Sequence, residues 1–194
     1  PDEAVRVLNR AVRLDPNAAQ SFNLIAEAQI MKGDHAAAAE TLRRGIEANP
    51  RTRNSHYLLA QVQETLHNTD VAINLYRQEL EIDASHFQAA VNLANLLKQA
   101  GKADEAARYY RMAIDANGSL KMPRFHLAEI MLREGRELEQ AVRLCLGGID
   151  LPPRDRETLF GYFVLTNLYD ALGNAERRDH YTRLGERLIA TLGR

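Results

Sequence analysis

Residues that end helices recur every 34 positions along this chain of 194 residues. One series of breaks falls at Pro16, Pro50, Ala84, Gly118 and Pro152, within the similar strings LDPN, ANPR, IDAS, ANGS and LPPR. A second series keeps the same step at Gly33, His67, Gly101 and Gly135, and then reaches Gly173 after a short insertion. Such residues terminate helices, so the chain is divided into short helices by two alternating kinds of break. A period of this length indicates stacked helical repeats rather than one central core.

The apolar residues between these breaks have helical spacing. Before Gly101, the positions i, i+3, i+4 and i+7 hold Ala90, Leu93, Ala94 and Leu97. After Gly101, a second stripe holds Ala106, Tyr110, Ala113 and Ile114. Each stripe is one face of an α-helix. Every repeat is therefore predicted to consist of two antiparallel helices joined by a short turn.

Two positions in each repeat carry small side chains. The position seven residues before the turn holds Ala26, Ala60, Ala94, Ala128 and Thr166. The position five residues after the turn holds Ala38, Ala72 and Ala106, with Ala141 shifted by one residue in the fourth repeat. We expect the two helices to approach each other closely at these positions. The fifth repeat carries Arg178 at the second position, which is typical of a terminal repeat with one solvated side.

This pattern resembles the tetratricopeptide repeat family, which has 34-residue repeats, small residues at both crossings, an aromatic residue on the second helix and a closing proline. The resemblance covers essentially the whole chain. It implies an all-α fold: a right-handed α-solenoid of about five helix-turn-helix repeats in a single domain, 1–194. The expected repeats are 19–52, 53–86, 87–120, 121–155 and 156–194, of which the last is a cap. The RNA-reading pentatricopeptide repeat has 35 residues and needs basic surfaces, so it is the weaker match.

Residues 1–18 match only the second helix of a repeat. Ala4, Leu8 and Ala11 fall at the positions of Ala38, Leu42 and Gly45. We therefore expect the chain to be a fragment of a longer tetratricopeptide repeat protein, with at least part of another repeat upstream. The alternative is that this helix is the amino-terminal cap. The sequence leaves the compartment open between cytoplasm and periplasm.

The charge balance excludes several classes of partner. The chain has 25 Lys and Arg against 26 Asp and Glu, whereas nucleic-acid and acidic-membrane binding need a basic excess. Its apolar runs are too short to span a bilayer. We therefore expect no nucleic acid among its partners and no membrane insertion.

The sequence carries no recognisable catalytic or metal-binding motif. No two of the six histidines fall three or four residues apart, as zinc ligands on a helix would. Cys145, the single cysteine, falls at a core position, and no glycine-rich phosphate-binding loop occurs. We expect no metal, no cofactor and no catalytic residue in this chain.

The resemblance implies a superhelix whose inner, concave wall is lined by the first helix of each repeat. The side chains expected on that wall are rich in amides, which donate and accept hydrogen bonds together and therefore suit the backbone of an extended peptide. Aromatic residues among them are expected to act as anchors. The candidate groove residues are Asn23, Glu27, Asn54, Tyr57, Gln61, Glu64, Gln88, Asn92, Asn95, Lys98, Phe125, Glu129, Arg133, Phe163 and Asn167, and Gln20, Met122 and Asp170 are expected on the same wall.

These observations favour a non-enzymatic scaffold that binds a peptide or protein segment in the concave groove. The family's carboxylate clamp is not expected, since its positions hold Asn23, Glu27, Gln88 and Asn92 without a lysine. One alternative is a C-terminal accessory region of a larger enzyme, such as a sulfatase-like hydrolase or a glycosyltransferase. Another is self-association through uncovered repeat ends.

Overall fold

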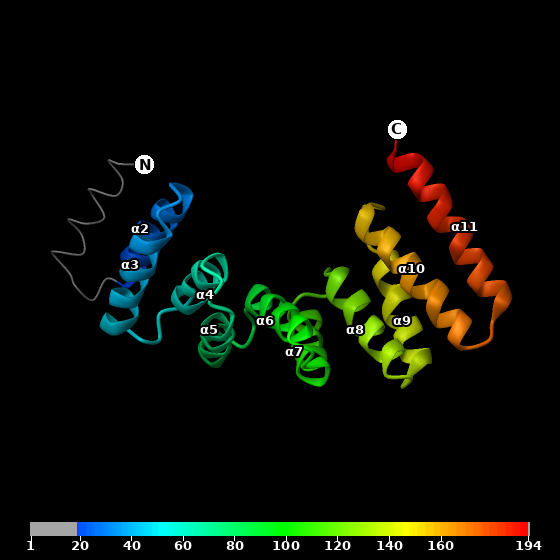
Figure 1. The fold of residues 1–194 in the computed structure, drawn as a ribbon, viewed down its shortest axis with the longest axis horizontal. Coiled ribbons are helices and arrows are strands. Elements are labelled where there is room, and N and C mark those ends of the chain that lie inside the picture. The colour runs from blue at the N-terminus through cyan, green and yellow to red at the C-terminus, as the bar shows by residue number, and fades with distance from the viewer. Residues whose placement is uncertain (1–18, 194) are drawn as a thin grey trace. The chain divides into compact units, whose positions relative to one another are not determined.

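The computed structural model describes residues 19–193, and this part of the chain is all α-helical, as predicted (Figure 1). The helix expected over 1–18 lies outside the described residues. The helices are α2 (Ala19–Met31), α3 (His35–Ala48), α4 (Ser55–Thr65), α5 (Thr69–Ile82), α6 (Phe87–Gln99), α7 (Ala103–Ala116), α8 (Met122–Arg133), α9 (Leu138–Ile149), α10 (Arg156–Ala171) and α11 (Ala175–Leu192).

The chain divides into two compact units, Pro1–Leu96 and Leu97–Arg194. The first unit contains α2 to α5 and most of α6. The second contains the last residues of α6 and α7 to α11.

The first unit is built from hairpins of two helices. Helix α2 packs against α3, and α4 packs against α5 (Figure 1). Helix α4 also packs against both α3 and α2, so the second hairpin lies on the first. Buried apolar residues fill the space between them: Ala26, Ala38, Ala39, Leu42, Leu58, Leu59 and Val62.

The second unit repeats the same arrangement. Helix α8 pairs with α9 and α10 pairs with α11, while α7 packs against α8. Helix α10 also packs against α9 and α8, as α4 does against α3 and α2. The first helix of one hairpin therefore covers the hairpin before it in both units.

The turn inside each hairpin has a left-handed residue where the sequence predicts the break. The φ angles are 79° at Gly33, 60° at His67, 74° at Gly101, 64° at Gly135 and 70° at Gly173. Glycine adopts this conformation without a steric penalty, whereas His67 does so at some cost in strain. The 34-residue period in the sequence therefore corresponds to a recurring left-handed residue in the backbone.

The small residues predicted at the helix crossings are buried. Their side chains have no exposed surface at Ala26, Ala38, Ala60, Ala72, Ala94, Ala106, Ala128 and Ala141. In the last hairpin, Arg178 stands at the second of these positions. Its guanidinium donates to the Asp170 carboxylate at 3.1 Å, so the position holds an ion pair instead of a small buried side chain.

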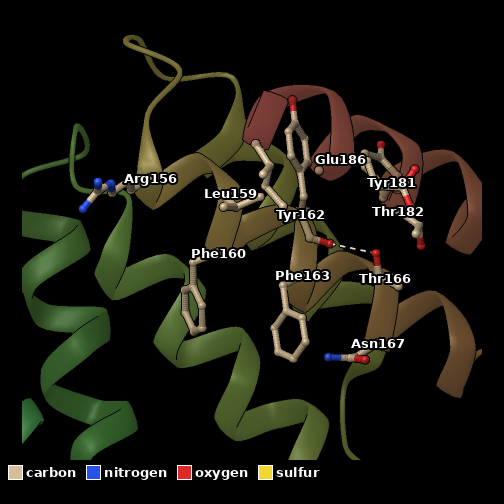
Figure 2. A pocket seen from close by; sticks show the side chains of 12 residues that line it. Arg156, Leu159, Phe160, Tyr162, Phe163, Thr166, Asn167, Tyr181, Thr182 and Glu186 are labelled. Carbon is tan, nitrogen blue, oxygen red and sulfur yellow. Dashed lines mark hydrogen bonds between the residues drawn. The ribbon is translucent and has the colours of Figure 1, made fainter. Parts of the chain in front are cut away.

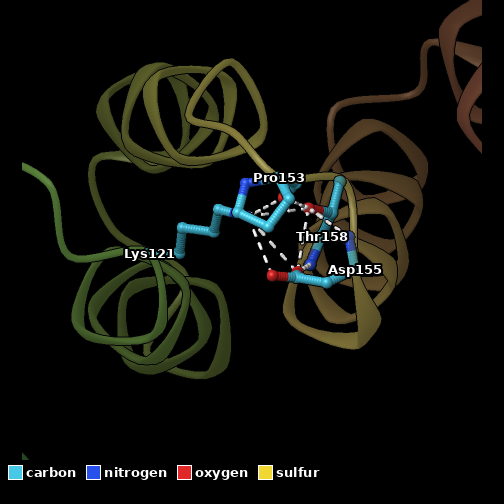
Figure 3. Close-up of polar contacts among 4 residues, drawn as sticks. All are labelled: Lys121, Pro153, Asp155 and Thr158. Carbon is cyan, nitrogen blue, oxygen red and sulfur yellow. Dashed lines mark hydrogen bonds and ion pairs between the residues drawn. The ribbon is translucent and has the colours of Figure 1, made fainter.

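A buried lysine joins the fourth hairpin, α8–α9, to the loop that precedes α10 (Figure 3). Lys121 is 5% exposed, and its ammonium donates to the carbonyl of Pro153. It also lies 3.2 Å from both carboxylate oxygens of Asp155 and 3.2 Å from the hydroxyl of Thr158. Asp155 in turn caps α10, because its side chain accepts the backbone N–H of Thr158. One cation therefore fixes the start of α10 on the hairpin before it.

Candidate functional site

Polar side chains of the first unit form a hydrogen-bonded cluster that joins α4, α5 and α6. Tyr57, Gln61, Glu64, Tyr76 and Asn92 make up this first-unit cluster. Gln61 donates to the Tyr57 hydroxyl at 2.9 Å, Tyr76 donates to the Glu64 carboxylate, and Asn92 donates to the Tyr76 hydroxyl at 3.1 Å. All members of this cluster except Tyr76 are predicted groove residues, and Tyr76 is contributed by α5.

The Tyr76 hydroxyl is the centre of the first-unit cluster. Burial and the hydrogen bond to Glu64 raise the pKa of Tyr76 well above its ordinary value. Burial, with Glu64 nearby, also raises the pKa of Tyr57. Both phenols therefore stay protonated at neutral pH, where the Tyr76 hydroxyl donates to Glu64 and the Tyr57 hydroxyl accepts from Gln61.

Two predicted groove residues instead have structural roles in the first unit. Asn23 is 3% exposed: its side chain accepts from the Ser55 hydroxyl at 2.8 Å and donates to the Arg53 carbonyl at 3.2 Å. Asn54 precedes α4 with φ 74°, and its side-chain oxygen lies 3.1 Å from Nε2 of His86. The Asn23 side chain therefore uses its hydrogen bonds to join α2 to the start of α4, and it is not available to a ligand.

A buried carboxylate caps α4 in the same region. Glu79 has no exposed surface and accepts the backbone N–H of Asn54 at 2.6 Å and that of Tyr57 at 3.2 Å. A negative charge at the N-terminus of a helix is stabilised by the helix dipole and by its free N–H groups. Glu79 on α5 thus holds the start of α4, and with it the backbone that carries Tyr57.

A charged cluster stands on one face of the second unit. The Lys98 ammonium lies 2.9 Å from Oε2 of Glu129 and 2.9 Å from Nδ1 of His126. Burial, and then the charge of Lys98, lower the pKa of His126, although Glu129 acts in the opposite direction. Burial alone would raise the pKa of Glu129, but the hydrogen bond and charge of Lys98 lower it below its ordinary value. At neutral pH the cluster is an ion pair beside a neutral imidazole.

Arg133 adds a second cation to this face. His126, Glu129 and Arg133 are spaced i, i+3 and i+7 on α8, so they lie on one side of the helix. Arg133 is exposed and makes no ion pair within residues 19–193. With Lys98, Gln99, Glu129 and Ile130, it lines a hollow of about 190 Å³. Two cations and one carboxylate leave this hollow with one uncompensated positive charge.

An aromatic row runs from this charged cluster across to α10. The rings of Tyr110 and His126 are 5.6 Å apart, those of His126 and Phe160 are 5.4 Å apart, and those of Phe160 and Phe163 are 6.4 Å apart. Tyr110 is fully buried, while Phe163 is 60% exposed, so the row rises from the core to the surface. We call Lys98, His126, Glu129, Arg133 and Phe160 the basic–aromatic surface.

Phe125 lies in the core and not in a groove. Its ring has no exposed surface, because it fits between Gly148 of α9 and Gly161 of α10. The absence of side chains at these two glycines makes room for the ring. The expectation that Phe125 anchors a ligand therefore does not agree with its position.

Phe163 and Asn167 line a cavity of about 520 Å³ between α10 and α11, which Phe160 of the basic–aromatic surface also lines (Figure 2). Figure 2 shows the Phe160 and Phe163 rings side by side on α10, with Asn167 one turn further along. The remaining predicted residues are placed as follows: Gln20 and Gln88 are exposed, and Glu27 and Asn95 are half-buried on α2 and α6.

Sequence reasoning missed Phe160 and His126 as surface residues. Phe160 occupies the same repeat position as Gln20, Asn54, Gln88 and Met122 once the four-residue insertion before α10 is counted. Extending that series would have found it. His126 occupies the position of Asn92, so the same comparison between repeats points to it.

Two observations bear on metal and thiol chemistry in the described residues. No group of three or more His, Cys, Asp or Glu side chains within 19–193 is arranged to hold a metal ion. Cys145 is fully buried, and burial raises the pKa of its thiol far above the ordinary value. Over the same residues, no helix combines the length and the apolar character that a membrane span needs.

Two family models match the sequence. Residues 2–79 match the model of the anaphase-promoting complex, cyclosome, subunit 3, and residues 57–121 match a tetratricopeptide repeat model. No curated protein matches the sequence.

Several solved structures resemble the fold. One is YrrB, described as a tetratricopeptide repeat protein with an unusual peptide-binding site, with 14% identity, a TM-score of 0.80, and coverage of 93% of this chain and 91% of that one. Another is MamA, with 16% identity, a TM-score of 0.76, and coverage of 89% and 92%. A third is PilF of Pseudomonas aeruginosa, with 14% identity, a TM-score of 0.74, and coverage of 94% and 82%. At these identities the likeness establishes the fold alone.

Proposed function

Because the chain belongs to the tetratricopeptide repeat family, we propose that it is a non-enzymatic scaffold that binds an extended segment of another protein. The peptide-binding site named for YrrB supports this class of function. The proposed binding site is the basic–aromatic surface of the second unit. One observation carries the choice: Arg133, with its uncompensated charge, lies on the same face of α8 as His126, whose ring contacts Phe160 of the aromatic row.

The chemistry of this surface selects a ligand with two features. The unpaired charge at Arg133 attracts a carboxylate, which a guanidinium binds with two parallel hydrogen bonds. The half-buried Phe160, stacked beside Phe163, offers an apolar contact. Aromatic and arginine side chains are enriched at protein interfaces, and Trp, Tyr and Arg are enriched among the few residues that dominate the binding energy.

The distance between the aromatic contact at Phe160 and the charged contact at Arg133 sets how far apart the matching residues of the ligand must be. His126, which touches the Phe160 ring, and Arg133 are seven residues apart on α8, or about 10 Å at 1.5 Å per residue. An extended chain advances about 3.3 Å per residue. The ligand therefore carries an acidic residue about three positions from an aromatic or aliphatic one.

The test selects peptides from a random display library on the full chain and measures the binding of individual synthetic peptides by fluorescence anisotropy. We expect enrichment of an acidic residue about three positions from an apolar one. Arg133→Glu should weaken these peptides at least about tenfold, because it places a like charge against the ligand carboxylate. The matched control is Arg111→Glu, which reverses another exposed arginine of the second unit, on α7.

Two results would contradict the proposal. One is the absence of any acidic preference among the selected peptides. The other is an equal effect of Arg133→Glu and Arg111→Glu, which would mean that net charge, and not this surface, governs binding. Circular dichroism of both variants checks that the helices are intact.

A further inference from the structure

The cavity between α10 and α11 has an apolar wall that nothing within residues 19–193 covers. Its volume is about 520 Å³, and its lining includes Phe163, Tyr181, Gly185 and Ile189 (Figure 2). Phe163 is 60% exposed and Ile189 is 56% exposed. Large apolar side chains exposed together mark an interaction site.

The preceding hairpin shows what covers the equivalent wall. Phe125 on α8 occupies the repeat position of Phe163, and Gly148 on α9 occupies that of Gly185. Phe125 is fully buried because α10 lies on it. A methyl group placed on Gly161 of α10 would stand 2.6 Å from the Phe125 ring, so only glycine fits at this contact.

The first unit has the same junction with different residues. Asn23 on α2 occupies the position of Phe125, and Ser55 on α4 occupies that of Gly161. The Ser55 hydroxyl donates to Asn23 at 2.8 Å, and both residues are buried. In both units, the covering element is the first helix of the next hairpin, and it places a small residue on this position.

We propose that the α10–α11 face binds an amphipathic α-helix of a partner protein, with a glycine packed on Phe163. The occupant follows from continuity with the helix–helix interface inside the chain, which has the same form at α2–α4 and at α8–α10. A helix in an apolar groove binds through residues at i, i+3, i+4 and i+7. This site lies on α10 and α11, and its ligand is helical, so it goes beyond the extended segment proposed for the basic–aromatic surface.

The probe is a labelled peptide with the sequence of residues 155–171, which contains α10 and Gly161, extended by a short lysine tag for solubility. It is mixed with the full chain and followed by fluorescence anisotropy. We expect saturable binding, with shifts in the amide NMR signals of Gly185 and Ile189. The control peptide carries Gly161→Leu, and it should bind at least about tenfold more weakly, since a leucine cannot approach the Phe163 ring.

Variants of the chain locate the binding. Phe163→Glu and Ile189→Glu place charges in the apolar wall and should each weaken the peptide at least about tenfold. Val71→Glu is the control, because Val71 on α5 is 48% exposed and does not line the cavity. All three residues are exposed, so none of the substitutions disturbs the core.

Three results would overturn the proposal. The peptide fails to saturate, or the Gly161→Leu peptide binds equally well, or Phe163→Glu behaves like Val71→Glu. Sedimentation of the chain alone adds a further outcome. A concentration-dependent dimer that Phe163→Glu abolishes would assign this face to a second copy of the chain and contradict a partner helix.

Discussion

The same substitution at one repeat position should have opposite effects in the last two hairpins. Gly148 and Gly185 occupy equivalent positions on α9 and α11. A methyl group on Gly148 would stand 2.4 Å from Cε1 and 2.8 Å from Cζ of Phe125. A methyl group on Gly185 would stand 3.6 Å from Leu159 Cδ1, which is an ordinary contact.

The magnitudes follow from these distances. To accept Gly148→Ala, the Phe125 ring must move about 1 Å, but Gly161 blocks its other side. Such overpacking costs about 1–3 kcal/mol, and the better helix propensity of alanine offsets about 0.5–1 kcal/mol of it. These ranges leave a net destabilisation of about 0–2.5 kcal/mol for Gly148→Ala, with a central value of about 1 kcal/mol, whereas Gly185→Ala should stabilise the chain by about 0.5–1 kcal/mol.

The assay is urea unfolding of the full chain followed by circular dichroism, with the midpoint and slope compared between variants. The double variant Gly148→Ala/Phe125→Leu provides a second check: a smaller side chain makes room for the methyl group, so the two losses should not add. The reasoning is refuted if Gly148→Ala unfolds at the same midpoint as the parent chain, or if Gly185→Ala is as destabilising as Gly148→Ala.

Three further predictions concern buried groups. Lys121→Met keeps the apolar stem but removes the hydrogen bonds to Pro153 and Asp155, so urea unfolding should show a loss of about 2 kcal/mol, and an unchanged midpoint would contradict the role of the lysine. The folded-state pKa of His126 is lowered from 6.5, so the unfolded chain binds more protons than the folded chain as the pH falls through 6.5. The free energy of unfolding should therefore decrease as the pH falls. His126→Gln should make the free energy of unfolding depend less on pH in unfolding curves measured between pH 7.5 and pH 5. Cys145 should not react with a thiol reagent in the native chain but should react fully in urea, and rapid native labelling would contradict its burial.

The fold could be predicted from the sequence because the same pattern of turn residues and small residues occurs in each repeat. A single glycine is weak evidence for a turn, but breaks at Gly33, His67, Gly101 and Gly135, each 34 residues after the one before, are not accidental. The positions that require small side chains could be predicted equally well. Ala60 and Ala94 must be small for two helix backbones to approach, and a requirement for volume is visible in the residue type.

The candidate site was less predictable because it depends on neighbouring hairpins. A helical wheel places Phe125 and Asn23 on the outer face of their own helices. Whether they stay exposed is decided by Gly161 and Ser55, which lie more than 30 residues further along the chain. Lys121 was missed for the same reason, since its partners belong to the loop before α10.

The interfaces between successive hairpins, here called joints, limit which repeats can be deleted or duplicated. Each joint has its own matched pair, such as Asn23 with Ser55 and Phe125 with Gly161. Deleting residues 53–86 would keep the 34-residue step but bring Ala89 to the place of Ser55, and the buried amide of Asn23 would lose the hydroxyl that it accepts from. The hairpins are therefore alike in shape but not exchangeable as modules, and shortening or duplicating this array requires the residues on both sides of a joint to change together.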